Sequence, residues 1–205
     1  MGIYGKYFLP KIINLACSRT QFMEQRRLIV PAAKGNVLEI GIGSGLNLPF
    51  YNLNNVKHIT AIEPSEELIK LTERYSNYLD IGIKLMKNNS DNIELESSSV
   101  DSIVITFTMC SIRNIINSFE EMRRVLKPEG KLIFCEHGLS PDRYVRKCQN
   151  LITPIWKKIS GGCHLDRPIS SIIENNGFKI DRLDTNYSKG WKPLSYIYKG
   201  TAKLN

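Results

Sequence analysis

The sequence predicts an α/β protein built on a mostly parallel β-sheet. Three observations support this fold class. Short apolar runs rich in β-branched residues recur along the chain, and helical patterns or helix-sized gaps separate the first five of them. The last two runs are joined by a loop with no helical pattern, as in a terminal hairpin. Alternating strands and helices favour a parallel sheet, and the hairpin adds one antiparallel strand.

The seven predicted strands lie at residues 37–40, 58–63, 82–86, 101–107, 131–136, 178–183 and 194–198. A helix is expected to start after the glycine-rich turn that follows the first strand, and another at Pro64, with acidic residues in its first turn. Phe119 and Met122 lie at helical spacing and indicate a further helix, which residues 128–130 are expected to end. A further helix is expected at residues 167–176.

Length and composition indicate one ordinary globular domain spanning residues 1–205. We predict no transmembrane helix and no export signal, because no apolar run approaches the roughly 20 residues that span a bilayer. Five cysteines without CxxC spacing indicate reduced thiols and a cytoplasmic protein. The net charge of +8 suggests an anionic partner without choosing between lipid and nucleic acid.

The most informative segment is VLEIGIGSG, residues 37–45, which places an apolar strand directly before Gly41, Gly43 and Gly45. Glycines let a nucleotide-like ligand pack against bare backbone. Glu39 precedes the first glycine, where a carboxylate would repel a pyrophosphate but could pair with an ammonium group. The segment therefore favours S-adenosylmethionine (SAM), whose methionine end carries an ammonium, over a dinucleotide.

Glu63 is the second informative carboxylate, at the end of the second predicted strand. An acid in this place can accept hydrogen bonds from both ribose hydroxyls of an adenosine-containing ligand. The alternative is a helix-capping acid before Pro64. Because strand, glycine loop and distal acid occur together, we favour ribose binding.

Together with AIEPS, SSSVDSIVITFT and RRVLKPEGKLIFCEHG, the glycine segment resembles the successive motifs of class I SAM-dependent methyltransferases over residues 36–138. The flanking LPKIINLACS, LNLPFY, TPIW and GGCHLDRP resemble a small bacterial branch related to the methyltransferase-like alkyl thiol S-methyltransferases and grouped with phospholipid and quinone methyltransferases. The resemblance implies a Rossmann-like, mostly parallel seven-stranded sheet with a C-terminal antiparallel hairpin.

The resemblance also implies the parts of the SAM site. Glu39 and the three glycines would hold the methionine end, Glu63 the ribose, and the loop at residues 88–91 the adenine. Many members of the family have Asp where this chain has Asn89, so the adenine contact would need the Asn89 carbonyl or Asp91. The complete predicted set of cofactor-binding residues is Glu39, Gly41, Gly43, Gly45, Asn47, Glu63, Asn89, Ser90, Thr106 and Thr108.

Methyl transfer needs mainly alignment of the acceptor with the sulfonium methyl group, and a protonated acceptor also needs a base. His137 follows the fifth strand and His164 lies in GGCHLDRP, so both are candidate catalytic residues. The alternative for His137 is a loop histidine bonded to backbone. Asp166 could orient His164 or cap the following helix. His58, at the opposite edge, is expected to be structural.

The spacing of the cysteines indicates no catalytic or metal-binding role. Cytosine-methylating enzymes carry their nucleophilic cysteine after a proline. Cys110 has no proline before it and is therefore expected to be a packed side chain. A metal on Cys163 and His164 would need two further ligands that no nearby spacing supplies, so we predict no metal site.

Residues 143–158 combine an apolar helical stripe with five basic residues and no acid. We interpret residues 139–165 as an amphipathic lid insertion over the acceptor pocket and residues 1–33 as an N-terminal helical cap. In this cap, Tyr7 and its apolar neighbours would form an apolar wall over the same pocket. The lid either packs its stripe on the core or touches an anionic membrane surface.

The sequence thus predicts a methyltransferase acting on a small, apolar or membrane-associated acceptor, with a thiol as first choice. A phospholipid or quinone is the alternative. An RNA-modifying enzyme or a non-catalytic SAM-binding protein would be a different class. Nucleic acid is disfavoured because stacking aromatics among the basic residues are few.

Overall fold

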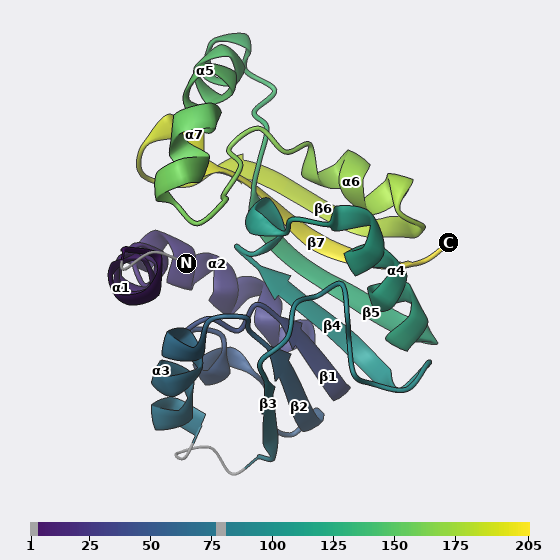
Figure 1. Cartoon of the computed structure of the whole chain (residues 1–205). Helices are drawn as coiled ribbons and strands as arrows, with labels where there is room; N and C mark the ends of the chain where they lie inside the picture. The colour runs from purple at the N-terminus through teal and green to yellow at the C-terminus, as the bar shows by residue number, and fades with distance from the viewer. Residues whose placement is uncertain (1–3, 77–80) are drawn as a thin grey trace.

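A seven-stranded sheet forms the centre of the molecule (Figure 1). The computed structural model describes residues 4–76 and 81–205. The strands occur in the order β3-β2-β1-β4-β5-β7-β6. Their bounds are β1 Gly35–Ile40, β2 Val56–Ile62, β3 Ile83–Met86, β4 Val100–Thr106, β5 Leu126–His137, β6 Phe178–Tyr187 and β7 Tyr196–Leu204.

The strand directions confirm the predicted fold class. β1 pairs in parallel with β2 and β4, and the parallel pairing continues to β3 on one side and β5 on the other. β7 is antiparallel to both β5 and β6. The carboxyl ends of β1, β2, β4 and β5 therefore meet at one edge of the sheet, where open α/β folds place their ligands.

Helices cover both faces of the sheet (Figure 1). Two buried apolar layers result. One includes side chains of α4 and α6, and the other includes side chains of α2. The helices are α1 Leu9–Cys17, α2 Thr20–Ile29, α3 Glu66–Ser76, α4 Ile115–Val125, α5 Arg143–Ile159, α6 Ile169–Asn175 and α7 Lys192–Ser195, with short turns η1 Tyr4–Phe8, η2 Val30–Ala32, η3 Leu48–Phe50 and η4 Met109–Ser111.

The helix expected after the glycine loop is absent from the described connection between β1 and β2, which contains only the three-residue turn η3. Pro49 removes a backbone donor, and the asparagines that follow favour turns over helix. That prediction was wrong. The loop instead folds back on itself, with the Gly45 N–H donating to the Ile42 carbonyl at 3.0 Å.

Other boundaries differ by a few residues. α3 begins at Glu66 rather than Pro64, and Ser65 Oγ accepts from the Leu68 N–H. α4 ends at Val125, because β5 starts at Leu126 and continues through residues 128–130. The last strand runs over 196–204 and is preceded by α7. α5 continues through Pro154 as one helix.

Among the described residues, no helix combines the length and the apolar character that a membrane crossing requires.

Candidate active site

A cleft of about 520 Å³ opens at the carboxyl ends of β1, β2 and β4. That volume is in the usual range for small-molecule and cofactor sites. The glycine loop forms its floor, and α1 supplies an apolar wall with Leu9, Ile13 and Cys17. Seven of the predicted cofactor-binding residues line it, namely Gly41, Gly43, Glu63, Asn89, Ser90, Thr106 and Thr108.

The glycine loop has the backbone that a close-fitting ligand needs. Gly41 and Gly43 have φ values of +71° and +60°, which L side chains rarely adopt. A Cβ on Gly41 would collide with the Thr108 side chain, whereas a Cβ on Gly43 would project into open space beside the cleft. Bare backbone therefore faces the cleft at Gly43.

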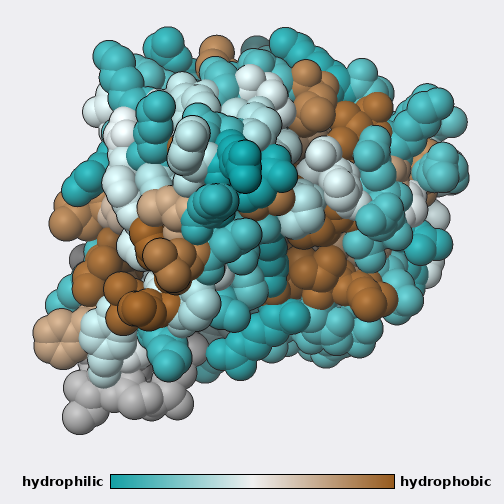
Figure 2. All heavy atoms as spheres, turned by 90° about the horizontal axis from the view of Figure 1, so that it is seen from above, coloured by the Kyte–Doolittle hydropathy of each residue, from teal (hydrophilic) through white to brown (hydrophobic). Residues whose placement is uncertain are grey.

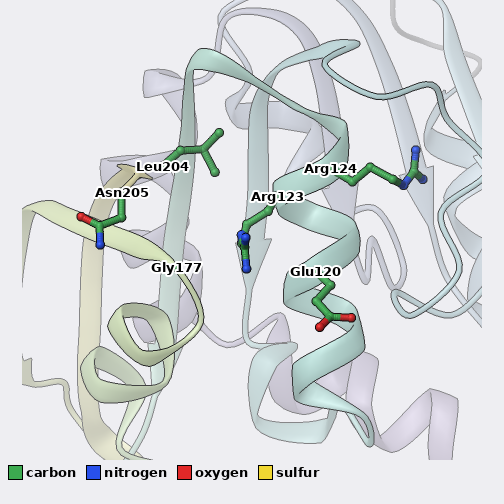
Figure 3. Close-up of a pocket in the computed structure, with 6 residues that line it drawn as sticks. All are labelled: Glu120, Arg123, Arg124, Gly177, Leu204 and Asn205. Carbon is green, nitrogen blue, oxygen red and sulfur yellow. The ribbon is translucent and has the colours of Figure 1, made fainter.

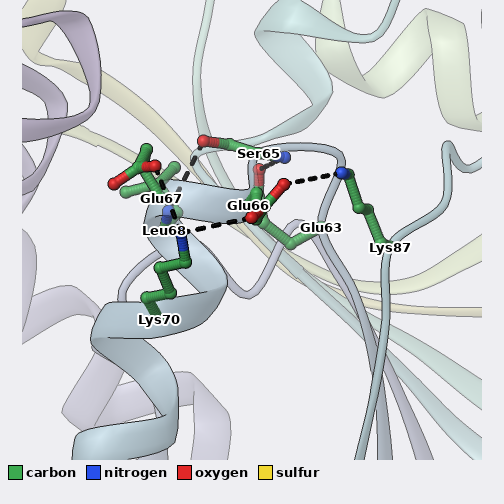
Figure 4. A network of polar contacts seen from close by, with 7 residues as sticks. All are labelled: Glu63, Ser65, Glu66, Glu67, Leu68, Lys70 and Lys87. Carbon is green, nitrogen blue, oxygen red and sulfur yellow. Dashed lines mark hydrogen bonds and ion pairs between the residues drawn. The ribbon is translucent and has the colours of Figure 1, made fainter. Parts of the chain in front are cut away.

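Glu63 is held with its carboxylate in the cleft, although only 7 % of the residue is exposed. Its two oxygens accept from the backbone N–H groups of Gly43 at 3.1 Å and Ser65 at 2.9 Å. Figure 4 shows this carboxylate behind a surface network in which Glu66 contacts Lys70 and Lys87. Burial raises the pKa of Glu63, and the two backbone donors oppose that rise.

Glu39 lies beneath the loop and away from the cleft surface, with 1 % exposure. Asn47 donates to one of its oxygens at 2.8 Å and the Tyr51 hydroxyl to the other at 2.7 Å. Burial raises its pKa, while these hydrogen bonds and nearby Arg26 oppose the rise. Direct pairing of Glu39 with an ammonium therefore stays a prediction, and Asn47 is the group through which Glu39 is connected to the site.

Arg26 is a site residue that no sequence motif indicates. Its guanidinium is buried at the cleft wall and donates to Asn47 Oδ1 at 2.9 Å and to Thr106 Oγ1. The same group lies 5.0 Å from the ring centroid of Phe107, a cation–π distance. Phe107 itself has a φ of +51°, so the backbone is strained where β4 enters the site.

The part of the cleft formed by the loop after β3 is polar. Asn89, Ser90 and Asp91 line it, as the predicted adenine loop requires. Ser90 Oγ lies 2.8 Å from Ser118 Oγ, which ties the loop to α4. The adenine contact itself stays a prediction.

The two candidate catalytic histidines lie outside the cleft lining. His137 is buried, with Nε2 3.2 Å from Cys163 Sγ, and its Nδ1 has no hydrogen-bond partner among the described residues. His164 Nδ1 lies 3.4 Å from Asp166 Oδ1, and burial together with the positive charge of Arg167 lowers the pKa of this imidazole. Asp166 is thus its orienting partner, whereas Pro168 occupies the N-cap of α6.

A second, more open depression lies between α4 and the C-terminus (Figure 3). Arg123, Arg124 and Glu120 contribute to it, with Gly177, Leu204 and Asn205 on the other side. The Arg124 guanidinium is already paired with Glu121 at 2.7 Å, and the depression holds none of the predicted cofactor residues. The glycine-loop cleft is therefore the candidate active site.

The cleft residues fit SAM. A fixed carboxylate stands at the end of β2, bare glycine backbone faces the cleft at the end of β1, and a polar loop after β3 lines the cleft. Parallel strands with this arrangement at their carboxyl ends define a Rossmann-like SAM-dependent methyltransferase domain. Residues 38–134 match the family model described as a methyltransferase domain, which agrees with SAM as the ligand that the cleft residues fit.

Known proteins agree with this class. The chain is 30 % identical over 161 residues to thiol S-methyltransferase TMT1B of Rattus norvegicus, covering 77 % of this chain and 63 % of that protein. It is 27 % identical over 144 residues to the ubiquinone/menaquinone biosynthesis C-methyltransferase UbiE of Rickettsia prowazekii, covering 64 % of this chain and 58 % of that protein. The chain thus spans less than two thirds of these relatives.

A solved structure shows the same fold. A SAM-dependent methyltransferase from Aquifex aeolicus superposes with a TM-score of 0.66 at 19 % identity, covering 97 % of this chain and all of that one.

Proposed function

We propose that this protein transfers the SAM methyl group to a small apolar acceptor, with a thiol as the first choice. The observation that carries this proposal is an apolar wall of the cleft. Leu9, Ile13 and Ile112 line that side of the cleft, so the cavity offers an apolar surface to whatever lies beside the cofactor. Two of the relatives bear names that fit such acceptors, a thiol S-methyltransferase and a quinone C-methyltransferase.

Catalysis in this proposal consists mainly of alignment. SAM supplies an electrophilic methyl group when bound. Glu63 would hold the ribose, because its carboxylate is already aimed by two backbone donors. The Arg26–Asn47–Thr106 network fixes the end of β4 against the glycine loop. An aligned acceptor then needs little further chemistry, and the apolar wall excludes water from it.

The N-terminal segment and α5 support an acceptor that arrives from a membrane surface. The Tyr4 hydroxyl donates to the Ile159 carbonyl at 2.8 Å, so the N-terminal segment contacts the end of α5. Both helices expose large apolar side chains, namely Phe8, Ile12 and Leu15 near the N-terminus and Tyr144, Leu151 and Ile155 on α5. Figure 2 shows apolar clusters among hydrophilic groups on the face seen from above.

α5 also carries the basic residues Arg143, Arg146, Lys147, Lys157 and Lys158, and within it acidic residues are absent. Apolar side chains beside cations are the combination that binds anionic bilayers peripherally.

An acceptor screen with methyl-labelled SAM tests the proposal. Alkyl thiols, phospholipids, demethylated quinones and RNA are offered in parallel, the lipophilic ones in vesicles. Labelled alkyl thiol is the expected product, and its formation should fall strongly in Glu63→Ala. Label in quinone or phospholipid would replace the thiol and keep the apolar acceptor. Label in RNA alone, or SAM binding without turnover on any acceptor, would overturn the proposal.

A further inference from the structure

Three soft ligand atoms meet behind the cleft wall. Cys110 Sγ, His137 Nε2 and Cys163 Sγ all lie within 4.8 Å of one another. Cys110 comes from η4 after β4, His137 ends β5, and Cys163 follows α5. The residues are 26 or more positions apart along the chain, which explains why sequence spacing gave no sign of the cluster. Cys163 is next to His164 in the sequence, whereas the fold pairs Cys163 with His137.

We propose that Cys110, His137 and Cys163 form a binding site for one thiophilic metal ion, with Zn²⁺ as the fitting case. Thiolate and imidazole are the ligands that zinc prefers. Bond lengths of about 2.0–2.3 Å place neighbouring ligand atoms of a tetrahedral site roughly 3.5–3.8 Å apart. The His137–Cys163 distance is 3.2 Å and no pair exceeds 4.8 Å, so shifts of about 1 Å or less would complete the geometry.

The surrounding polar contacts hold the segments that carry the two cysteines in place. Glu136 Oε1 accepts from the N–H groups of Thr108 at 2.7 Å and Met109 at 2.9 Å, which fixes the start of η4. Arg167 donates to the Met109 carbonyl and, at 2.6 Å, to the Ile112 carbonyl on the other side of Cys110. The His164 N–H donates to the Cys110 carbonyl at 2.9 Å and joins the two cysteine segments.

The site would be of the open kind. Two thiolates balance the charge of a divalent ion, and three protein ligands leave a fourth position for water or another ligand. Phe107, Ser111 and Gly161, close neighbours of the cluster residues in the chain, line the cleft. The metal would therefore lie directly behind the acceptor side of the cleft. This inference does not depend on the identity of the acceptor.

Cobalt substitution of the reduced full-length protein tests the site. We expect one Co²⁺ per chain, with the sulfur-to-cobalt charge-transfer absorption and the visible bands of a tetrahedral site, and displacement by Zn²⁺. Cys163→Ser and Cys110→Ser should each weaken Zn²⁺ binding at least tenfold and diminish the charge-transfer band. Cys148→Ser is the matched control, because that cysteine lies on α5 outside the cluster.

SAM binding and far-ultraviolet circular dichroism establish that each variant is folded, and His137→Gln provides a third variant that keeps both thiols. The proposal is overturned if the reduced protein binds no stoichiometric Co²⁺ or Zn²⁺, or if the charge-transfer band survives both cysteine substitutions. It is also overturned if Cys110 and Cys163 form a disulfide that persists under reductant. None of these readouts involves methyl transfer, so they are independent of the proposed function.

Discussion

Glu63 and Glu39 are both buried carboxylates near the glycine loop, but they have different partners. Glu63 accepts from two backbone N–H groups and lines the cleft, so its remaining lone pairs are available to a ligand. Glu39 accepts from Asn47 and Tyr51 below the loop, so its contacts are within the protein. At the scale of single residues, one acid is suited to bind the cofactor and the other to position the residues that form the site.

Glu63→Ala is expected to weaken SAM binding at least tenfold in isothermal titration calorimetry, because the ribose hydroxyls would lose their acceptor. Glu66→Ala is the matched control, since that exposed carboxylate contacts Lys70 and Lys87 on the surface. Unchanged affinity in Glu63→Ala, with the control also unchanged, would show that the ribose is held elsewhere.

Glu39 should make stability fall as pH rises. Its folded-state pKa is raised by burial, so the folded protein keeps this proton at pH values where the unfolded chain has released it. The resulting stabilisation is complete below the unfolded pKa and is lost as pH rises through the folded one. Urea unfolding between pH 4 and 8 should show wild type losing stability relative to Glu39→Gln. Parallel curves for the two proteins would contradict this assignment.

At the scale of elements, α5 combines an exposed apolar stripe with a cluster of lysines and arginines. Only Val145, Gln149 and Thr153 are buried within it, so one narrow face of the helix packs on the protein. Gln149 Nε2 donates to the carbonyls of Gly138 and Pro193, both at 2.9 Å, which attaches the helix by polar contacts. Tyr144, Leu151 and Ile155 of the apolar stripe are exposed, whereas Trp156 packs against Trp191.

Reversing the charge of Lys157 and Lys158 to Glu should abolish retention on anionic liposomes in flotation at low salt, because each basic residue near such a surface contributes about 1 kcal/mol. Lys179→Glu with Lys203→Glu is the control. It changes the net charge equally on β6 and β7, where these two exposed residues are register partners. A wild-type protein that stays unbound would refute membrane contact through α5.

At the scale of the whole molecule, the cleft is closed by segments from distant parts of the chain. α1 meets the glycine loop through a contact of 2.5 Å between Asn14 Oδ1 and Ser44 Oγ, and Leu9 lies beside Gly161 after α5. A bound cofactor would therefore contact both the sheet and the N-terminal helix α1. Part of its binding free energy would stabilise the packing of α1 against the glycine loop.

SAM is accordingly expected to slow amide hydrogen exchange in α1 and in the glycine loop, measured by mass spectrometry with and without the cofactor. α6 is an internal reference, because it packs on the sheet away from the cleft. Equal protection of α1 in both states would show that the helix takes no part in binding.

The sequence by itself determined the sheet, the glycine loop and the position of Glu63, because strand periodicity and glycine placement are local properties of the chain. It could not predict η3, because a proline and several asparagines overrode the helix that the motif normally introduces. Arg26 also escaped prediction, since a lone arginine on α2 carries no signal until the fold places it against Thr106 and Phe107.

The tertiary structure alone decided which side chains meet across the sheet. Parallel strands bring the ends of β4 and β5 together, and the segment after α5 returns to the same edge, so Cys110, His137 and Cys163 meet although their spacing shows no pattern. Contacts of this kind depend on chain topology, which sequence periodicity does not encode. The cofactor could therefore be predicted from local motifs, whereas the surroundings of the acceptor could be found only in the folded molecule.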